Sequence, residues 1–90
     1  MNRSEVLDEA KACVTRDRTA THGEAENSFT IIAALWSAYL GVEIKPHDVA
    51  AMMVAFKLGR YRKNPGHADN SVDAAGYAAL MGELGSEVQS

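Results

Sequence analysis

The 90-residue chain has little or none of several features that would mark a specialised class of protein. Its single cysteine, Cys13, excludes an internal disulfide framework and a cysteine-ligated zinc site. No apolar run approaches the ~20 residues of a membrane span, and the N-terminus is too charged for a signal peptide. We therefore expect no membrane association and a cytoplasmic location.

Several catalytic and nucleic-acid signatures are also missing. There is no glycine-rich phosphate loop, no GxSxG elbow and no HExxH pair of zinc-binding histidines. The formal net charge is -3, so general electrostatic attraction to nucleic acid is not expected. The apolar and alanine-rich segments also lack the row of Arg, Asn and Gln residues that reads bases. Nucleic acid is therefore not an expected partner.

The sequence does contain four amphipathic segments and no convincing strand alternation. Helices are predicted over about residues 4–17, 23–40, 46–63 and 70–84, within a chain that is 47% hydrophobic. Four helices with short links predict one all-α domain over residues 1–90, a compact four-helix bundle. Because a chain this short buries a modest fraction of its surface, we expect a homo-oligomer.

Local signals place the ends of these helices. Ser4 is expected to cap the first and Thr21 the second. Gly41 should end the second helix, and Pro46 should be the first residue of the third. A turn follows at residues 64–66, Asn-Pro-Gly. The cap of the fourth helix is expected among residues 69–71, and its last residues, SEVQS, should fray.

The second helix should form the centre of the core because it carries most of the aromatic mass. One face is expected to hold Phe29, Ile32, Ala33, Trp36, Tyr39 and Leu40, widened by Ile31 and Leu35.

A cluster of opposite charges lies around the turn at residues 64–66. Lys57 and Arg60 are three residues apart at the end of the third helix and so point in similar directions, and Arg62 follows them. Asp69 and Asp73 come after the turn, at the start of the fourth helix. Cations beside carboxylates suit a polyphosphate with a divalent ion. The cations would hold the phosphates.

Acidic residues also open the second helix. If the starts of the second and fourth helices face each other, their oxygen ligands meet around Mg²⁺, which prefers carboxylates, water and phosphate. The expected metal ligands are Asp73, Asp69, Glu24 and Glu26. A metal-bound water there would be activated for hydrolysis.

A plainer interpretation of the same residues stays open. Carboxylates in the first turn of a helix ordinarily complement its dipole. Asp73 could instead form a structural ion pair with Lys57 or Arg60. His22 and His67 precede the two acidic helix starts and could converge on one site, or lie in solvent as most loop histidines do.

Two long stretches resemble a known family. RTATHGEAENSFTIIAALWSAYL and DVAAMMVAFKLGRYRKNPGHADNSVDAAGYAAL are similar to small phage and prophage proteins of unassigned function. The shared order is Lys-x-x-Arg, then His-x-Asp, then Asp-x-x-Gly-Tyr, and the resemblance covers roughly residues 16 to 80.

This signature more distantly resembles all-α nucleoside triphosphate pyrophosphohydrolases of the MazG and dimeric dUTPase type. Those enzymes bind Mg²⁺ through Glu-Glu-x-x-Glu on one helix and Glu-x-x-Asp on another. The resemblance aligns Glu24 and Asn27 with the first helix, and Asn70 and Asp73 with the second. Each Asn removes a negative charge from the pattern, which weakens binding of a divalent ion. The resemblance also implies a dimer or tetramer.

The leading hypothesis is an oligomeric phage-type protein that binds a nucleotide. In its enzymatic version, the protein also hydrolyses a nucleoside triphosphate with Mg²⁺. Asp73, Glu24 and Asp69 would then be catalytic. Supporting polar contacts are expected from Asn27, Asn70, His22, His67 and Tyr77. Two alternatives stay open, namely a non-catalytic module that sequesters a nucleotide signal of host defence, and a small structural or adaptor protein.

Overall fold

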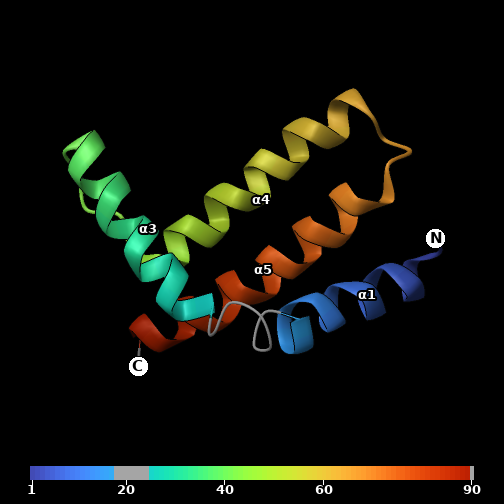
Figure 1. Ribbon diagram of the computed structural model, residues 1–90, viewed down its shortest axis with the longest axis horizontal. Helices are drawn as coiled ribbons and strands as arrows, with labels where there is room; N and C mark the ends of the chain where they lie inside the picture. Colours follow the sequence, from blue (N-terminus) through green and yellow to red (C-terminus); the bar gives the residue numbers. More distant parts are fainter. Residues whose placement is uncertain (18–24, 90) are drawn as a thin grey trace.

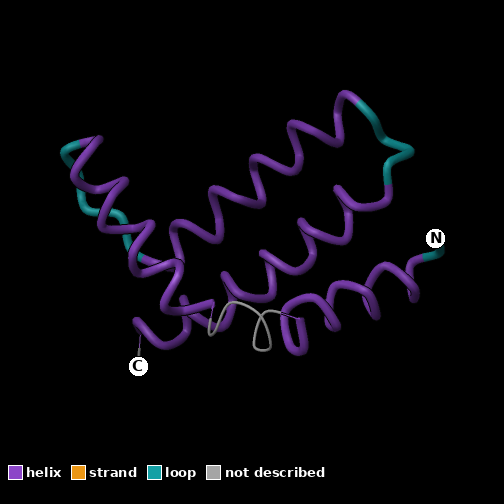
Figure 2. The backbone as a smooth tube through the Cα atoms, in the orientation of Figure 1, coloured by secondary structure: helices purple, strands orange, loops and turns teal. Residues whose placement is uncertain are grey.

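The computed structural model describes residues 1–17 and 25–89, with side chains described for residues 1–15 and 28–87. Within these ranges every regular element is helical (Figures 1 and 2). The elements are α1 (Arg3–Ala12), the π-helical turn η1 (Cys13–Asp17), α3 (Ala25–Leu40), α4 (Pro46–Lys63) and α5 (Ala68–Gln89). The predicted all-α class is confirmed. No helix in the described ranges is long and apolar enough to cross a membrane.

The antiparallel pair α4–α5 forms the largest helix contact of the fold. A short loop joins the two helices at one end of the pair (Figure 1). α1 lies along α5, and α3 packs on the N-terminal part of α4 at the end away from that loop (Figure 1). Only one end of the α4–α5 pair is therefore covered by α3.

The first helix begins earlier than its predicted cap. Asn2, and not Ser4, caps α1, because the Asn2 side chain accepts a hydrogen bond from the Glu5 N–H at 2.8 Å. The Glu5 carboxylate accepts one from the Asn2 N–H at 2.8 Å, which completes a reciprocal capping box. The expected cap Thr21 lies outside the described residues.

The last turn of the first helical segment is a π-helix, although the sequence predicted an α-helix through residue 17. The Thr15 hydroxyl donates a hydrogen bond to the Lys11 carbonyl at 2.6 Å. That carbonyl is the acceptor an α-helix would offer to the backbone N–H of Thr15, so the side chain competes with the regular ladder. Single π turns of this kind interrupt α-helices locally.

The link between α3 and α4 follows its predicted signals. Gly41 ends α3 with φ of 74°, a left-handed conformation that glycine adopts without strain. The Ser37 hydroxyl accepts a hydrogen bond from the Ile44 N–H at 2.8 Å, which holds the link against α3. Pro46 opens α4, and the Asp48 carboxylate accepts from the Lys45 N–H at 2.9 Å. The predicted bounds of α4 are confirmed.

Both ends of α5 differ from the prediction. The helix begins at Ala68, so the three expected cap residues 69–71 lie inside its first turn. The His67 carbonyl already accepts from the Asn70 N–H at 3.1 Å. At the other end the helix continues to Gln89, where fraying was expected. Buried Leu84 anchors this part, and a Cβ added at Gly85 would lie 4.0 Å from that of His47 on α4.

The core lies where α3, α4 and α5 meet. Its buried side chains are Phe29, Ala33, Val49, Ala50, Leu80 and Leu84. Ile32 and Trp36 pack against this cluster, as expected. Four further residues predicted on this face are exposed, namely Ile31, Leu35, Tyr39 and Leu40. For Tyr39 and Leu40 the reason is that the C-terminal half of α3 extends away from the α4–α5 pair (Figure 1).

Candidate functional site: a polar cleft between α4 and α5

A cleft of about 610 Å³ lies at the end of the α4–α5 pair that α3 leaves uncovered. It is bounded by the last turns of α4, the connecting loop and the first turns of α5. Its lining residues are Lys57, Arg60, Lys63, Asn64, His67, Asp69, Asn70 and Asp73. All of them are polar or charged, and most are residues that the sequence singled out.

The α4 wall of the cleft is basic because of helical spacing. Lys57, Arg60 and Lys63 follow one another at intervals of three residues, so they share one side of the helix. Arg62 does not line the cleft. It comes two residues after Arg60, which turns it about 200° around the helix. Of the three cations predicted to bind phosphate, the structure therefore brings together Lys57 and Arg60.

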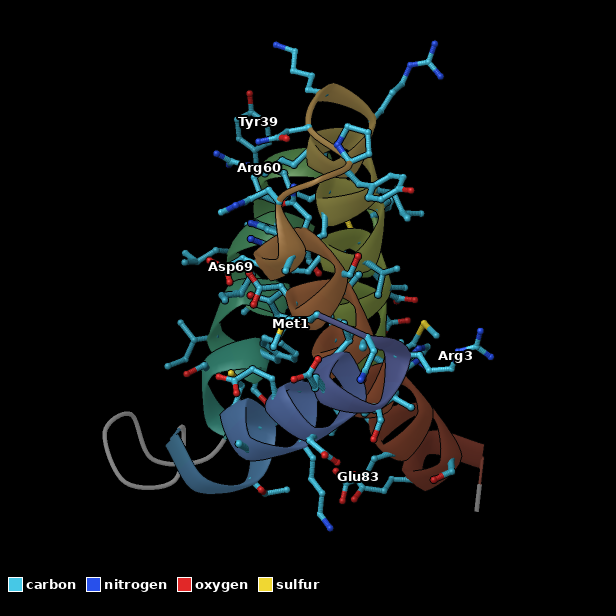
Figure 3. All side chains as sticks on the ribbon, turned by 90° about the vertical axis from the view of Figure 1, so that its right-hand side faces the viewer. Met1, Arg3, Tyr39, Arg60, Asp69 and Glu83 are labelled. Atoms are coloured by element: carbon cyan, nitrogen blue, oxygen red, sulfur yellow. The ribbon has the colours of Figure 1, made fainter. Side chains whose placement is uncertain are left out.

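The α5 wall supplies carboxylates. Asp69 and Asp73 are one helical turn apart, and both line the cleft. Figure 3 shows Asp69 and Arg60 on the same side of the molecule, one from each helix. The His67 Nε2 atom lies 3.6 Å from Asp69 Oδ2, so a protonated His67 would form an ion pair there.

An ion pair crosses the cleft between the two helices. Lys57 Nζ lies 2.9 Å from Asp73 Oδ2, with the Lys57 side chain 17% exposed and that of Asp73 38% exposed. The structural ion pair that the sequence left open is therefore present. At this exposure it stabilises the fold by at most about 1 kcal/mol. It also fixes the Lys57 ammonium group inside the cleft.

An aromatic ring lies close to two of the cations. The Arg60 guanidinium carbon is 5.3 Å from the centre of the Phe56 ring, and Lys57 Nζ is 5.6 Å from it. These are cation–π distances, which orient both side chains. The Phe56 side chain is itself half exposed.

Asn70 is the buried polar residue of this site, with 5% of its surface exposed. Among the described residues, no hydrogen bond to its side-chain amide is found. A buried amide nearly always has partners. Those of Asn70 must come from water, from a ligand or from side chains outside the described set.

Tyr77 does not line the cleft. Its ring stacks on Phe29 with centroids 6.2 Å apart and an interplanar angle of 28°. It borders a separate cavity of about 200 Å³ between η1 and α5, together with Cys13 and Val14. Asp73 lines both cavities, so the two lie next to each other along α5.

Only some of the proposed metal ligands are among the described residues. His22 and Glu24 lie outside the described residues, and so do the side chains of Glu26 and Asn27. The described side chains contain no group of three or more His, Cys, Asp or Glu residues placed to hold a metal ion. Asp69 and Asp73 alone are too few for Mg²⁺, which takes six ligands and keeps waters among them. The described start of α3 lies at the end of the α4–α5 pair away from the first turn of α5 (Figure 1), so the two helix starts do not face each other as expected. A magnesium site in the cleft therefore needs further ligands from water or substrate phosphate.

Lys63 and Asn64 line the cleft although the sequence argument did not select them. A signal was present in the spacing. Lys63 lies three residues after Arg60, and Asn64 lies seven residues after Lys57, which are the intervals of one helix face. Lys63 was recognised as one of the cations before the turn but was not among the predicted phosphate-binding residues, and Asn64 was interpreted as the first residue of the Asn-Pro-Gly turn.

The charge arrangement of the cleft differs from that of the chain. Three cations face two carboxylates in the cleft, whereas the whole chain has a formal net charge of -3. The first turn of α5, which is the positive end of the helix dipole, also borders the cleft. The cleft thus combines donors for an anion with carboxylates that could hold a cation.

Comparison with known sequences gives the class of protein. The family model DUF6378, a domain of unknown function, matches residues 5–85. The chain therefore belongs to this family, whose match includes α4, the cleft and most of α5. The Gene 55 protein of Mycobacterium phage L5 is 39% identical over 80 residues, which is 88% of this chain and 51% of that protein.

A second phage relative agrees. The Gene 55 protein of Mycobacterium phage D29 is 36% identical over 76 residues, covering 84% of this chain and 50% of that protein. The chain spans about half the length of the curated relatives it matches. No solved structure matches the chain. The resemblance to small phage proteins of unassigned function is confirmed.

Proposed function

We propose that this phage-type protein binds a nucleotide in the α4–α5 cleft, with Arg60 and Lys63 on the phosphates and Lys57 beside them. The observation that carries the proposal is the convergence of three cations in one cleft of an otherwise acidic chain. Arg60 can grip a phosphate with two parallel N–H groups, while the lysines act as point charges.

The rest of the cleft favours a nucleotide over a bare phosphate ion. Its volume of about 610 Å³ is in the range of small-molecule sites. The buried amide of Asn70 offers two donors and an acceptor to a polar ligand group. The half-exposed Phe56 ring beside the cations could contact a sugar or base.

The two carboxylates favour a ligand that arrives with a divalent ion. Asp69 and Asp73 would repel a phosphate group placed next to them. A Mg²⁺ ion between carboxylates and phosphate oxygens removes this repulsion. Water and the phosphate oxygens would complete its ligands in this proposal.

Hydrolysis of a nucleoside triphosphate to monophosphate and pyrophosphate is the second candidate. It is favoured by the position of Asp69 and Asp73, which lie one turn apart on the α5 wall of the cleft and face the cations of the proposed phosphate site on α4. The resemblance to MazG-type enzymes supports the same reaction. In this form of the proposal Asp69 and Asp73 would hold the Mg²⁺, which would supply an activated water, and the cations of the α4 wall would stabilise the charge that develops on the phosphates.

Calorimetric titration with nucleoside di- and triphosphates, in Mg²⁺ and separately in EDTA, tests the binding. Arg60→Ala is expected to weaken binding about tenfold or more, because it removes a charge-assisted hydrogen bond. Arg62→Ala is the matched control. It removes the same charge only two residues from Arg60, but Arg62 lies outside the cleft. Equal effects of the two variants, or no binding of any common nucleotide, would contradict the proposal.

A chromatographic assay of a mixed pool of nucleoside triphosphates with Mg²⁺ tests turnover. Release of monophosphate and pyrophosphate that stops with EDTA, and that is lost in Asp73→Ala, would establish the hydrolase. Tight binding with an unchanged pool would instead favour sequestration of a nucleotide. If neither binding nor turnover is found, the charged residues serve the fold, and the structural or adaptor alternative is favoured.

A further inference from the structure

The exposed side of α3 carries an apolar stripe that nothing in the chain covers within the described residues. Ile31, Leu35 and Tyr39 follow one another at intervals of four residues, so they lie along one side of the helix. Their exposed fractions are 63%, 64% and 89%. Three large apolar side chains in a row form a continuous patch rather than scattered surface residues.

This segment is also free of charge. From Ser28 to Val42 the sequence contains no Asp, Glu, Lys, Arg or His, although 23% of the chain is charged. A helix that faced water on its outer side would carry charged residues there. The composition of α3 is that of a helix buried on more than one side.

The position of α3 makes the stripe accessible to a partner. Its C-terminal half extends beyond the α4–α5 pair (Figure 1). That half contacts the short link to α4 through Ser37 and Ile44, while Leu35 and Tyr39 stay exposed. The helix therefore presents the stripe away from the core.

The accessible surface of the chain is larger than its size requires. It measures 6214 Å², whereas a folded monomer of 9.7 kDa has about 5,100 Å². The excess of about 1,100 Å² exceeds the ~800 Å² that each partner buries in a standard interface. This excess is summed over the whole chain, and a second copy that covers the α3 stripe would remove part of it.

We propose that a second copy of this chain covers the α3 stripe in a two-fold symmetric homodimer. Antiparallel pairing of two α3 helices places Leu35 next to the symmetry axis, and sets Ile31 opposite Tyr39 of the partner subunit. Such an interface must be self-complementary. An uncharged apolar stripe meets that condition even though each copy carries a net charge of -3.

Sedimentation velocity over a wide concentration series tests the dimer. The wild-type chain is expected at twice the monomer mass, and Leu35→Glu is expected to weaken association about a hundredfold or more, because it brings two carboxylates together near the axis. Leu7→Glu is the matched control, since Leu7 is 62% exposed on α1, outside the stripe. A wild-type chain that stays monomeric, or equal effects of the two variants, would overturn the proposal.

A second readout uses the single tryptophan. Trp36 is adjacent to Leu35 in sequence and partly buried, so dissociation on dilution should shift its emission to longer wavelength. Tyr39→Ser provides a second variant in case Leu35→Glu does not fold. It should show the long-wavelength emission at concentrations where the wild type does not, and unchanged emission in Tyr39→Ser would count against the interface.

Discussion

The two ends of the α4–α5 pair have opposite character although the same two helices form both. At the end covered by α3, Val49 and Ala50 from α4 face Leu80 and Leu84 from α5, and all four are buried. At the other end, cations of α4 face carboxylates of α5 across the cleft. The comparison shows that α3 sets the boundary between core and cleft, because it packs on only one half of the pair.

Both ends use the same side of α4. Arg60 lies eleven residues after Val49, which is close to three helical turns, so the two side chains differ by only about 20° in direction. Changes to the covered end should therefore act on stability, and changes to the cleft should act on ligand binding. The following experiments test that separation, beginning with the largest expected effect.

Phe29→Ala should destabilise the fold by about 3–5 kcal/mol, because it leaves a large void in the core and removes the ring that stacks on Tyr77. Denaturant unfolding followed by circular dichroism measures the change. Against a typical total of 5–15 kcal/mol, roughly a third or more of the stability would be lost. A change below ~1 kcal/mol would show that α3 does not hold the covered end.

Asn70→Leu should separate stability from binding at the cleft end. Replacing a buried amide without described partners by an apolar group of similar size should leave the free energy of unfolding unchanged or raise it by about 1 kcal/mol. The same change should weaken nucleotide binding about tenfold, because the ligand loses hydrogen bonds. Denaturant unfolding measures the free energy of unfolding, and calorimetric titration of the same preparation measures the nucleotide affinity. A strong loss of stability would mean that the amide is bonded within the fold.

Alanine substitution should change the stability of the fold differently at Gly59 and at Gly76. A Cβ at Gly59, on the open half of α4, meets nothing within 4 Å, so Gly59→Ala should stabilise the helix by about 0.5–1 kcal/mol. A Cβ at Gly76 would lie 3.0 Å from Val14 Cγ1, where α5 meets η1. Gly76→Ala should therefore gain less than Gly59→Ala or be destabilising. Thermal unfolding of both variants makes the comparison, and equal gains would contradict the close contact.

The Lys57–Asp73 ion pair should make the smallest contribution to the free energy of unfolding. A double-mutant cycle with Lys57→Met and Asp73→Asn is expected to give a coupling energy of about 0.2–1 kcal/mol, since Asp73 is more than a third exposed. The coupling should fall in high salt. A coupling energy of several kcal/mol would indicate that the charged residues of the cleft stabilise the fold as strongly as core residues do.

Much of the fold could be predicted from the sequence because its signals are local. Gly41 and Pro46 each determine a helix end through backbone geometry alone, and both were placed correctly. Asn2 and the extension of α5 were missed for different reasons. Ser4 and Asn2 are equally good caps by type, and the anchoring of α5 depends on contacts with α4 that no local pattern contains.

The candidate site was predicted in outline. Lys57, Arg60, Asp69 and Asp73 were selected by spacing and charge, and the structure places all four around one cleft. The burial of Asn70 and the exposure of Tyr39 could not be predicted, because they depend on where α3 lies relative to the other helices. The roles of Glu24 and Glu26 as metal ligands stay a prediction.

The continuity of α4 from core to cleft constrains how its length can change. One residue inserted between Met53 and Lys57 would rotate everything after it by about 100° and advance it by about 1.5 Å. Val49 and Ala50 would keep their places in the core, while Lys57 and Arg60 would turn out of the cleft. An added residue in the link at residues 41–45 would not change this alignment. Within α4, therefore, the number of residues is as much a determinant of the site as their identity.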